Sequence, residues 1–358
     1  MQGLNLPPPS PLHRGKNPDD AIRSTDGDAS LARLSAVRKG YLLDPYVHAL
    51  VPGAHFKPSL SPQMNLGTYV RSTAIDALVN GWLRLAEREG RQCQIVSLGA
   101  GSDTRFWRLA TSELKQTLAK YIEIDFKEVT AAKASAICKN QELAKILGDM
   151  TPGDYLTDHD NGAIYSSIYN LLPSDLRTAP SESLTPLLAS NGSAPPLLSP
   201  SLPTLLLFEC VLVYMPPVAS TSLINWFVDY LESSSTLGAI VYEMFGLDDA
   251  FGRMMLSNLK KRNLYLPGAY PTLESLSTRF TDLGFTSAGA ARLPDIRKST
   301  IPPAELQRIV KLEMLDEIEE LDLTLNHYAI TWAVKSPQQV GVPWGDWGLD
   351  LNRSKTTL

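Results

Sequence analysis

The segment from residue 94 to residue 126 constrains the fold more than any other part of the chain. An apolar run at 94–98 leads directly into a turn, Gly99-Ala-Gly101, and a helical stretch and a second apolar run at 121–126 follow. This order of strand, glycine turn, helix and strand is a βαβ unit, in which the two strands must be parallel. We therefore predict an α/β, Rossmann-like fold with a central, mostly parallel sheet and added helices.

The other apolar segments continue this alternation. The run at 204–214 is apolar on both faces, as expected for a strand in the middle of a parallel sheet. Its neighbours predict further strands at 167–172, 238–245 and 327–335, and helices at 67–88, 127–147, 223–231, 250–262 and 303–322. These elements predict one domain over residues 29–335, interrupted by a long loop at 181–203 that is rich in Ser, Pro and Leu.

The two ends of the chain have a different composition. Residues 1–28 are rich in Pro, Asp, Ser and Gly and have almost no apolar periodicity, so we expect them to be disordered and dispensable for activity. The first helix should begin near Asp28. Residues 336–358 form a C-terminal tail, in which Trp344 and Trp347 are candidates to dock it on the domain.

Composition excludes several classes of function. The net charge of the 358-residue chain is -5, so no basic face for nucleic acid is expected. The most apolar run, Leu205–Met215, is too short to cross a membrane and contains Glu209. Three separated cysteines form no CxxC pair, which predicts neither a metal site nor disulfides. With no apolar stretch typical of a signal peptide near the N-terminus, we expect a cytoplasmic protein.

The glycine turn indicates a nucleotide-like ligand. Glycines allow a sharp turn and let a ligand approach the backbone closely, as dinucleotides and S-adenosylmethionine both require. The dinucleotide pattern needs a third glycine where this chain has Thr104, and Asp103 would repel a pyrophosphate. The turn therefore favours S-adenosylmethionine, whose sulfur is cationic, over NAD. A tight turn with no ligand remains the simpler alternative.

Three acidic residues lie where a cofactor would be bound. Glu123 and Asp125 share one face at the end of the second strand, and either could accept the ribose hydroxyls of an adenosine. Glu209 lies in a run that should be buried, where an unpaired carboxylate is costly. Its partner is then a cation, either the ammonium of the cofactor or an arginine of the protein.

Several motifs together resemble the leucine carboxyl methyltransferases. The resemblance rests on Leu98-Gly-Ala-Gly-Ser-Asp-Thr-Arg-Phe-Trp-Arg-Leu109, Tyr121-Ile-Glu-Ile-Asp-Phe126 and Phe208-Glu-Cys-Val-Leu-Val-Tyr-Met215, with shorter matches at 39–46, 65–71, 173–177 and 312–317. It spans roughly residues 30–335. Leu66 replaces an expected arginine, and residues 149–165 and 181–203 do not align.

The resemblance implies a reaction and a set of site residues. The reaction is transfer of a methyl group from S-adenosyl-L-methionine to the C-terminal leucine of the protein phosphatase 2A catalytic subunit, which regulates assembly of the phosphatase holoenzyme. By position, Arg71 would hold the cofactor carboxylate with Lys39 nearby, and Gly99 would lie beneath the methionine part. Asp125 would bind the ribose, Asp175 and Leu176 the adenine, and Glu209 the amino group. Gly101 completes this set as the second glycine of the turn.

The implied acceptor also determines the catalytic requirements. An α-carboxyl group has a pKa of about 3.3–3.7, so at neutral pH it is already a nucleophile and needs no general base. We name Tyr214 and Arg71 as catalytic residues, with Tyr214 positioning the carboxylate through its hydroxyl or, alternatively, only packing. Cations of the 250–262 helix, Arg253, Lys260, Lys261 and Arg262, are candidates to steer an acidic tail.

Other functions remain open from the sequence. A methyltransferase of the same wider family could act on a small molecule or a tRNA base, although the tRNA-modifying branch would need a long repeat domain after the last strand. A catalytically inactive binding module is the alternative from a different class.

Overall fold

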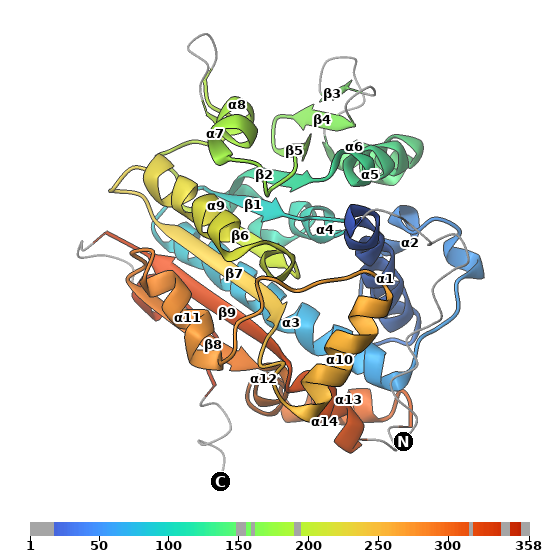
Figure 1. Ribbon diagram of the computed structural model, residues 1–358. Helices are drawn as coiled ribbons and strands as arrows, with labels where there is room; N and C mark the ends of the chain where they lie inside the picture. Colours follow the sequence, from blue (N-terminus) through green and yellow to red (C-terminus); the bar gives the residue numbers. More distant parts are fainter. Residues whose placement is uncertain are drawn as a thin grey trace.

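The computed structural model describes residues 18–147, 155–158, 162–189, 195–314, 318–337 and 344–351, and these form one large sheet with helices on both faces (Figure 1). The strand order is β3-β4-β5-β2-β1-β6-β7-β9-β8. Strands β5, β2, β1, β6 and β7 are parallel, and antiparallel strands extend both edges. The predicted α/β fold with a mostly parallel sheet is confirmed. The strands are β1 (Cys93–Leu98), β2 (Leu118–Asp125), β3 (Tyr155–Asp158), β4 (Ala163–Ser166), β5 (Tyr169–Pro173), β6 (Thr204–Glu209), β7 (Leu237–Met244), β8 (Ser287–Arg292) and β9 (Tyr328–Lys335).

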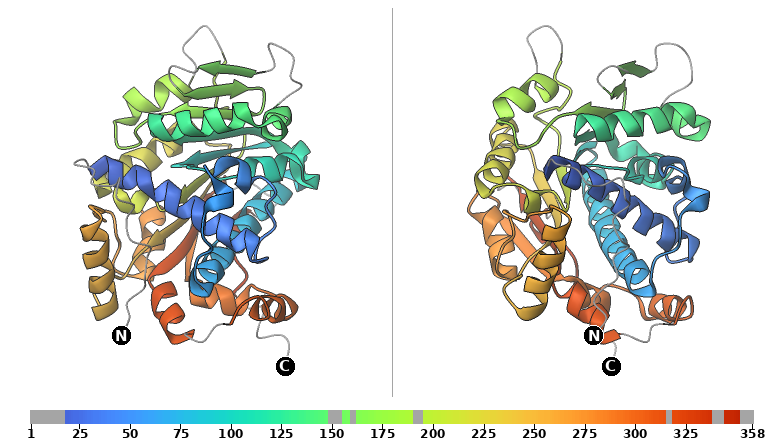
Figure 2. Two further views of the ribbon diagram at one scale, coloured as in Figure 1. Left: turned by 90° about the vertical axis from the view of Figure 1, so that its right-hand side faces the viewer. Right: turned by 45° about the vertical axis from the view of Figure 1, so that its right-hand side comes forward.

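Helices cover the sheet on both sides (Figure 2). Alternate residues of β6 face opposite layers: Leu205 and Leu207 pack in the core that includes α3, and Leu206 and Phe208 in the core that includes α9. This double burial explains why the strand is apolar on both faces. The helices are α1 (Pro18–Arg38), α2 (Val47–Leu50), α3 (Pro62–Arg88), α4 (Arg105–Ala110), α5 (Lys127–Lys139), α6 (Gln141–Leu147), α7 (Pro180–Ser183), α8 (Thr185–Leu188), α9 (Pro217–Tyr230), α10 (Ala250–Lys261), α11 (Leu273–Thr281), α12 (Leu293–Ser299), α13 (Pro303–Val310) and α14 (Ile318–Leu325), with short 3-10 turns η1 (Ala54–Phe56), η2 (Glu113–Thr117), η3 (Leu212–Tyr214) and η4 (Trp344–Asp346).

Some predicted elements have different limits. Strand β6 ends at Glu209, because Cys210 adopts a left-handed backbone conformation (φ 57°) and turns the chain into η3. The predicted loop at 181–203 contains most of α7 and all of α8; residues 190–194 lie outside the described residues. The single helix predicted at 303–322 is two helices, α13 and α14.

The N-terminal prediction was wrong where the structure can test it. Helix α1 begins at Pro18, so residues 18–28 are helical, and residues 1–17 lie outside the described residues. Three of its carboxylates bind distant parts of the chain: Asp19 pairs with Arg177, Asp28 with Arg262, and Asp26 accepts from Ser102. These tertiary contacts stabilise a segment whose composition alone resembles that of a disordered one.

The C-terminal segment packs against α3. Trp344 and Trp347 lie on Trp82, with ring centroids 4.5 and 5.1 Å from its ring. The indole nitrogen of Trp347 donates to the carbonyl of Leu78 (3.0 Å), and that of Trp344 to Glu89 (2.5 Å). Both tryptophans therefore dock the C-terminal segment on the domain, as predicted. Residues 338–343 and 352–358 lie outside the described residues.

Removing one of these rings should destabilise the domain. We expect Trp347→Ala to lower the free energy of unfolding by about 3–5 kcal/mol, as large-to-small changes of buried aromatic residues do. Trp226→Ala, which removes a half-buried indole stacked on Tyr230 at the surface of α9, is the control and should cost less. Urea denaturation of both variants measures the difference, and equal losses would show that the C-terminal contacts contribute little.

Candidate active site

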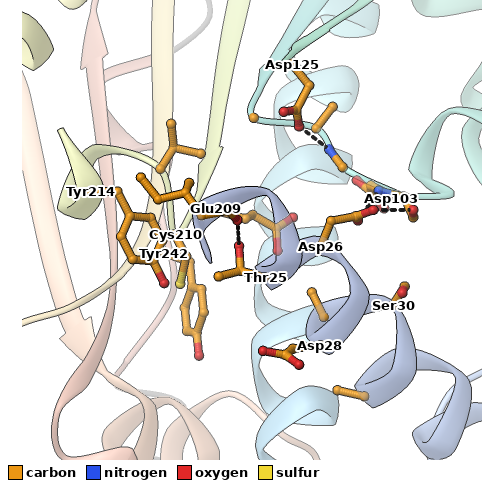
Figure 3. A pocket seen from close by; sticks show the side chains of 18 of the residues that line it. Thr25, Asp26, Asp28, Ser30, Asp103, Asp125, Glu209, Cys210, Tyr214 and Tyr242 are labelled. Atoms are coloured by element: carbon orange, nitrogen blue, oxygen red, sulfur yellow. Dashed lines mark hydrogen bonds between the residues drawn. The ribbon is translucent and has the colours of Figure 1, made fainter. Parts of the chain in front are cut away.

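A cavity of about 380 Å³ lies at the carboxyl ends of the parallel strands (Figure 3). Its floor is formed by the segments that follow β1, β2, β5 and β6, and α3 lines one wall. Helix α1 lies across it, and the end of α10 contributes Leu259 and Arg262. Carboxyl ends of parallel strands are where ligands bind in open α/β sheets. The position therefore agrees with a cofactor site.

The glycine turn after β1 is packed too tightly for side chains. Gly99 and Gly101 have positive φ angles of 68° and 48°. A Cβ atom on Gly99 would lie 2.3 Å from the Val211 side chain, and one on Gly101 would lie 2.6 Å from a carboxylate oxygen of Asp26. Glycine is thus required both for the backbone conformation and for the close approach of two neighbouring segments.

The structure separates the two acids of β2. Asp125 lines the cavity and accepts hydrogen bonds from the backbone amides of Gly101 and Phe126, both at 2.7 Å. Burial raises the pKa of Asp125 to about 6, although these two amides counteract the effect. Glu123 is fully buried beside Lys133 (2.5 Å) and the Tyr169 hydroxyl (2.6 Å). Asp125 is therefore the one available to a ligand, and Glu123 belongs to a structural ion pair.

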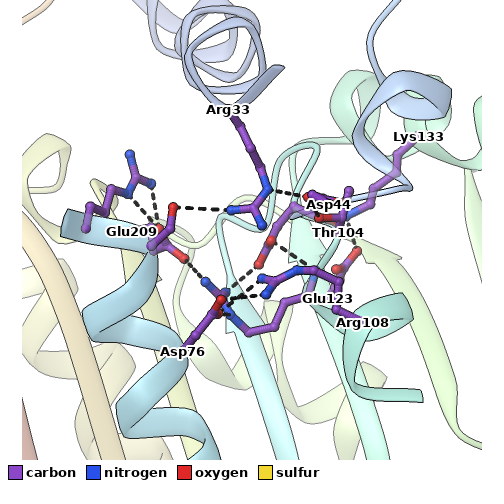
Figure 4. Close-up of polar contacts among 12 residues, drawn as sticks. Arg33, Asp44, Asp76, Thr104, Arg108, Glu123, Lys133 and Glu209 are labelled. Atoms are coloured by element: carbon purple, nitrogen blue, oxygen red, sulfur yellow. Dashed lines mark hydrogen bonds and ion pairs between the residues drawn. The ribbon is translucent and has the colours of Figure 1, made fainter. Parts of the chain in front are cut away.

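Glu209 lies between two arginines (Figure 4). Arg71 donates from Nε to Glu209 Oε2 and its second nitrogen lies at the same distance, 2.7 Å, while Arg105 approaches Oε1 at 2.9 Å. Burial favours the neutral acid, but the two guanidinium groups outweigh it and hold the pKa of Glu209 below its usual value. Of the two cations left open by the sequence, the structure supplies arginine. The Arg71 guanidinium also lies 4.4 Å from the centre of the Tyr242 ring.

A larger network of ion pairs holds Arg105 in place. Its side chain is almost fully buried and pairs with Asp103 (2.5 Å) and Asp76 (3.0 Å). Asp76 also binds Arg108 (2.5 Å), and these arginines lower the pKa of Asp76 against the opposing effect of burial. Asp103 is thus engaged in structural support of the site.

Helix α1 provides two basic residues to the cavity, Arg23 and Arg33, and the sequence analysis missed both. Arg23 pairs with Asp20 at 2.5 Å. Arg33 lines the cavity and binds Asp44 (2.5 Å) and the Ser72 hydroxyl (3.3 Å). Lys39, the predicted residue, is not among the lining residues and pairs with Glu313 at 3.0 Å. We therefore leave Lys39 out of the site. Helical spacing could have indicated Arg33, because it shares a face of α1 with Asp26 and Ala29, had the helix been recognised.

Asp175 and Leu176 follow β5 and also line the cavity. Arg177 donates two hydrogen bonds to the Asp175 carboxylate, at 2.6 and 2.9 Å, and a third to Asp19 of α1 at 2.6 Å. These contacts connect this end of the cavity to α1. Hydrogen bonds from Arg177 outweigh the effect of burial and lower the pKa of Asp175.

The wall opposite the glycine turn carries uncharged hydroxyl and thiol groups. Tyr214 lies in η3 after β6, rather than on the strand itself, and lines the cavity with Tyr242, Tyr328 and Cys210. Burial raises the pKa of all three tyrosines well above the usual value and that of Cys210 to about 12. These groups therefore remain protonated at neutral pH and can donate hydrogen bonds to a ligand. No histidine is found among the described residues that line the cavity.

Metal binding and membrane insertion can also be assessed over the described residues. In the described ranges, no group of three or more His, Cys, Asp or Glu residues is arranged to hold a metal ion. Among the helices of those ranges, none is long and apolar enough to cross a membrane.

The parallel sheet, the glycine turn after β1 and the carboxylate at the end of β2 place the chain among the Rossmann-like methyltransferases that use S-adenosylmethionine. A family model, "Leucine carboxyl methyltransferase", matches residues 21–228. Leucine carboxyl methyltransferase 1 of Cryptococcus neoformans var. neoformans serotype D is 44% identical over 92% of this chain and 97% of that protein. The rat protein of the same name is 35% identical over 90% of this chain and 92% of its own length. The chain belongs to the leucine carboxyl methyltransferase family.

Among solved structures, a putative methyltransferase from Thermobifida fusca is similar at 14% sequence identity. It has a TM-score of 0.45 and covers 81% of this chain and 92% of that one.

Proposed function

We propose that this enzyme transfers the methyl group of S-adenosyl-L-methionine to the α-carboxylate of the C-terminal leucine of the protein phosphatase 2A catalytic subunit. The modification would regulate assembly of the phosphatase holoenzyme. Family membership supports a leucine carboxylate as the acceptor. The phosphatase is inferred from the resemblance of the motifs described above.

The residues of the cavity fit the cofactor. Arg71 and Arg33 provide positive charge for its carboxylate, and Glu209 provides negative charge for its amino group. The turn at Gly99 and Gly101 offers backbone that a ligand can approach closely. Asp125 is the acceptor for the ribose hydroxyls. Asp175 and Leu176, in the segment that follows β5, are assigned to the adenine. When bound, the cofactor supplies a methyl group on a positively charged sulfur.

The observation that carries the proposal is the wall of protonated groups formed by Tyr214, Tyr242, Tyr328 and Cys210. Such a wall offers hydrogen-bond donors but no general base at neutral pH. An alcohol or amine acceptor generally has to lose a proton, whereas a carboxylate does not. The chemistry of the wall therefore suits a carboxylate acceptor.

The protein's contribution would be alignment and exclusion of water. In this proposal the Tyr214 hydroxyl would donate to the acceptor carboxylate, and Arg71 would hold the cofactor side of the cavity together with Glu209. The reaction neutralises charge, because a carboxylate and a sulfonium become an ester and a thioether. Water stabilises the charged reactants more than the transition state, so the coverage that α1 and α10 provide should accelerate the reaction.

The proposal is tested with tritiated S-adenosylmethionine and purified phosphatase catalytic subunit. We expect label that is released by mild base, as a methyl ester is, and no label on a subunit whose C-terminus is amidated. Equal labelling of free and amidated C-termini would exclude carboxyl methylation. Base-stable label would indicate a different acceptor on the subunit, such as a side-chain amine.

Helix α10 is the candidate surface for steering the acidic tail, but its cations have different roles. Arg262 binds Asp28 of α1, and Arg253 donates to the Asp248 carbonyl. Lys260 and Lys261 are exposed. Among the described residues, the two lysines form no ion pair, and Lys261 donates to the uncharged Asn258 side chain at 3.2 Å. Their positive charges can therefore act through long-range attraction.

We expect the double charge reversal Lys260→Glu/Lys261→Glu to raise the KM for the phosphatase subunit roughly 3- to 10-fold, because exposed charges each contribute about 0.2–1 kcal/mol. Cofactor affinity should stay unchanged. The control is Lys139→Glu/Lys145→Glu, the same change of charge on exposed positions of α5 and α6, which lie far from α10 (Figure 1). Steady-state kinetics at two salt concentrations measure the KM of both variants. An unchanged KM would exclude α10 as a steering surface.

A further inference from the structure

One face of helix α1 lines the proposed cofactor site. Ile22, Asp26, Ala29 and Arg33 recur at helical spacing and all line the cavity. Figure 3 shows Asp26 on this helix, turned toward the segment that carries the glycine turn. A residue on this face of α1 is therefore able to interact directly with the bound cofactor.

Asp26 is bound only to uncharged donors. One carboxylate oxygen accepts from the backbone amide of Ser102 (2.6 Å) and the other from the Ser102 hydroxyl (2.8 Å). Within the part of the chain that the structure describes, no lysine, arginine or histidine forms an ion pair with Asp26. Its negative charge is thus left uncompensated beside the glycine turn.

Most other carboxylates of the cavity are neutralised by arginine. Asp28 pairs with Arg262, Asp103 with Arg105, Asp175 with Arg177, and Glu209 with both Arg71 and Arg105. Asp125 resembles Asp26 in accepting hydrogen bonds from uncharged donors, here the backbone amides of Gly101 and Phe126. The negative charge of Asp26 contributes, after burial, to the raised pKa of Asp125. Two unpaired carboxylates therefore face the same region, and a cation placed there would relieve their repulsion.

We propose that Asp26 is a specificity-determining residue of the cofactor site, whose carboxylate favours the positively charged methyl donor over its neutral demethylated product. The inference rests on the proposed cofactor site. The two ligands share the same adenosine, amino and carboxylate groups and differ in the charge on sulfur. A negative charge without a partner in a partly desolvated site attracts the sulfonium and has no such effect on the thioether.

Asp125 and Glu209 should discriminate less between the methyl donor and its demethylated product. The assigned role of Asp125 is to bind ribose hydroxyls, which both ligands carry. Glu209 is compensated by two arginines and is assigned to an amino group that both ligands also carry. The negative charge of Asp26 on α1 would instead distinguish the charged methyl donor from its neutral product. Loss of this attraction after methyl transfer would favour release of the product.

The experiment measures the dissociation constants of S-adenosylmethionine and S-adenosylhomocysteine for the full chain by isothermal titration calorimetry. Asp26→Asn removes the charge and retains an oxygen that can accept from Ser102. We expect it to weaken donor binding at least fivefold more than product binding. Asp26→Glu should retain the preference for the donor.

Two controls separate charge from structure. Ser102→Ala removes one contact of Asp26 without removing its charge. Glu142→Gln makes the same change of charge at an exposed position of α6 that does not line the cavity. Both should leave the ratio of the two dissociation constants within twofold of wild type.

The outcomes are distinguishable. Equal weakening of both ligands by Asp26→Asn, or no weakening, would overturn the inference while leaving the cofactor site intact. A wild-type protein that binds neither ligand would overturn the proposed function itself. Because Asp26 is half-buried and forms no ion pair with a cation in the described ranges, the Asn variant should fold, and its melting temperature verifies this.

Discussion

Replacing Arg71 by alanine is expected to reduce kcat/KM roughly 10²- to 10³-fold. Arg71 contacts Glu209 through two nitrogens at 2.7 Å and covers the face of the Tyr242 ring. Its loss leaves Glu209, a largely buried carboxylate, with Arg105 as its remaining cationic partner. Breaking a buried ion pair by removing one member costs about 3–5 kcal/mol. The same change also removes the positive charge proposed to bind the cofactor carboxylate.

The measurement pairs steady-state kinetics with cofactor binding. Arg71→Lys should recover only part of the activity, because lysine cannot make the two-nitrogen contact. The control is Arg84→Ala on the same helix. Arg84 pairs with Glu113 on the surface, where both side chains are more than half exposed (58% and 78%), so its removal should be nearly neutral. An Arg71→Ala enzyme with wild-type kcat/KM would remove Arg71 from the catalytic machinery.

The second large effect concerns the two acids of β2. We expect Asp125→Ala to weaken cofactor binding about 10- to 150-fold, since a hydrogen bond to a charged group contributes about 1.5–3 kcal/mol. Thermal stability should change little, because the partners of Asp125 are backbone amides at the edge of the cavity.

Glu123→Ala is the matched comparison. It should destabilise the fold but leave cofactor affinity nearly unchanged. It leaves the buried ammonium of Lys133 with a carbonyl contact to Asp103 but without its carboxylate partner. The expected cost is about 3–5 kcal/mol of folding free energy. Protein that remains folded should bind the cofactor within threefold of wild type. Calorimetric unfolding and cofactor titration of both variants provide the test, and the reverse ranking in affinity would show that the ribose is bound elsewhere.

Residues close together in sequence determined much of the fold. The glycine turn and its flanking strands were predictable because both the left-handed conformation at Gly99 and the apolar runs are local properties. The capping box of α11, Thr272 with Ser275, was an equally local signal that was missed. The sequence signal for strand β8 was weaker, because β8 is a short strand of mostly small residues at the edge of the sheet, next to β9.

Contacts between distant segments decided the site. By position on the strand alone, Glu123 and Asp125 were equivalent, and the family resemblance favoured Asp125. The packing of Lys133 and Tyr169 against Glu123 supplies the physical reason for the difference. The cation beside Glu209 could not be named either, because Arg71 lies 138 residues away along the chain.

The N-terminal segment shows the same division most clearly. Composition determined that residues 18–28 have little apolar surface and so little tendency to fold alone. The tertiary structure decided that they are helical, because Arg177, Ser102 and Arg262 bind their carboxylates from three separate parts of the chain. The sequence by itself thus determined the parallel centre of the sheet, the glycine turn and the class of cofactor. Only the folded chain decided which charges are paired, since the energy of a charge depends on neighbours that sequence distance does not reveal.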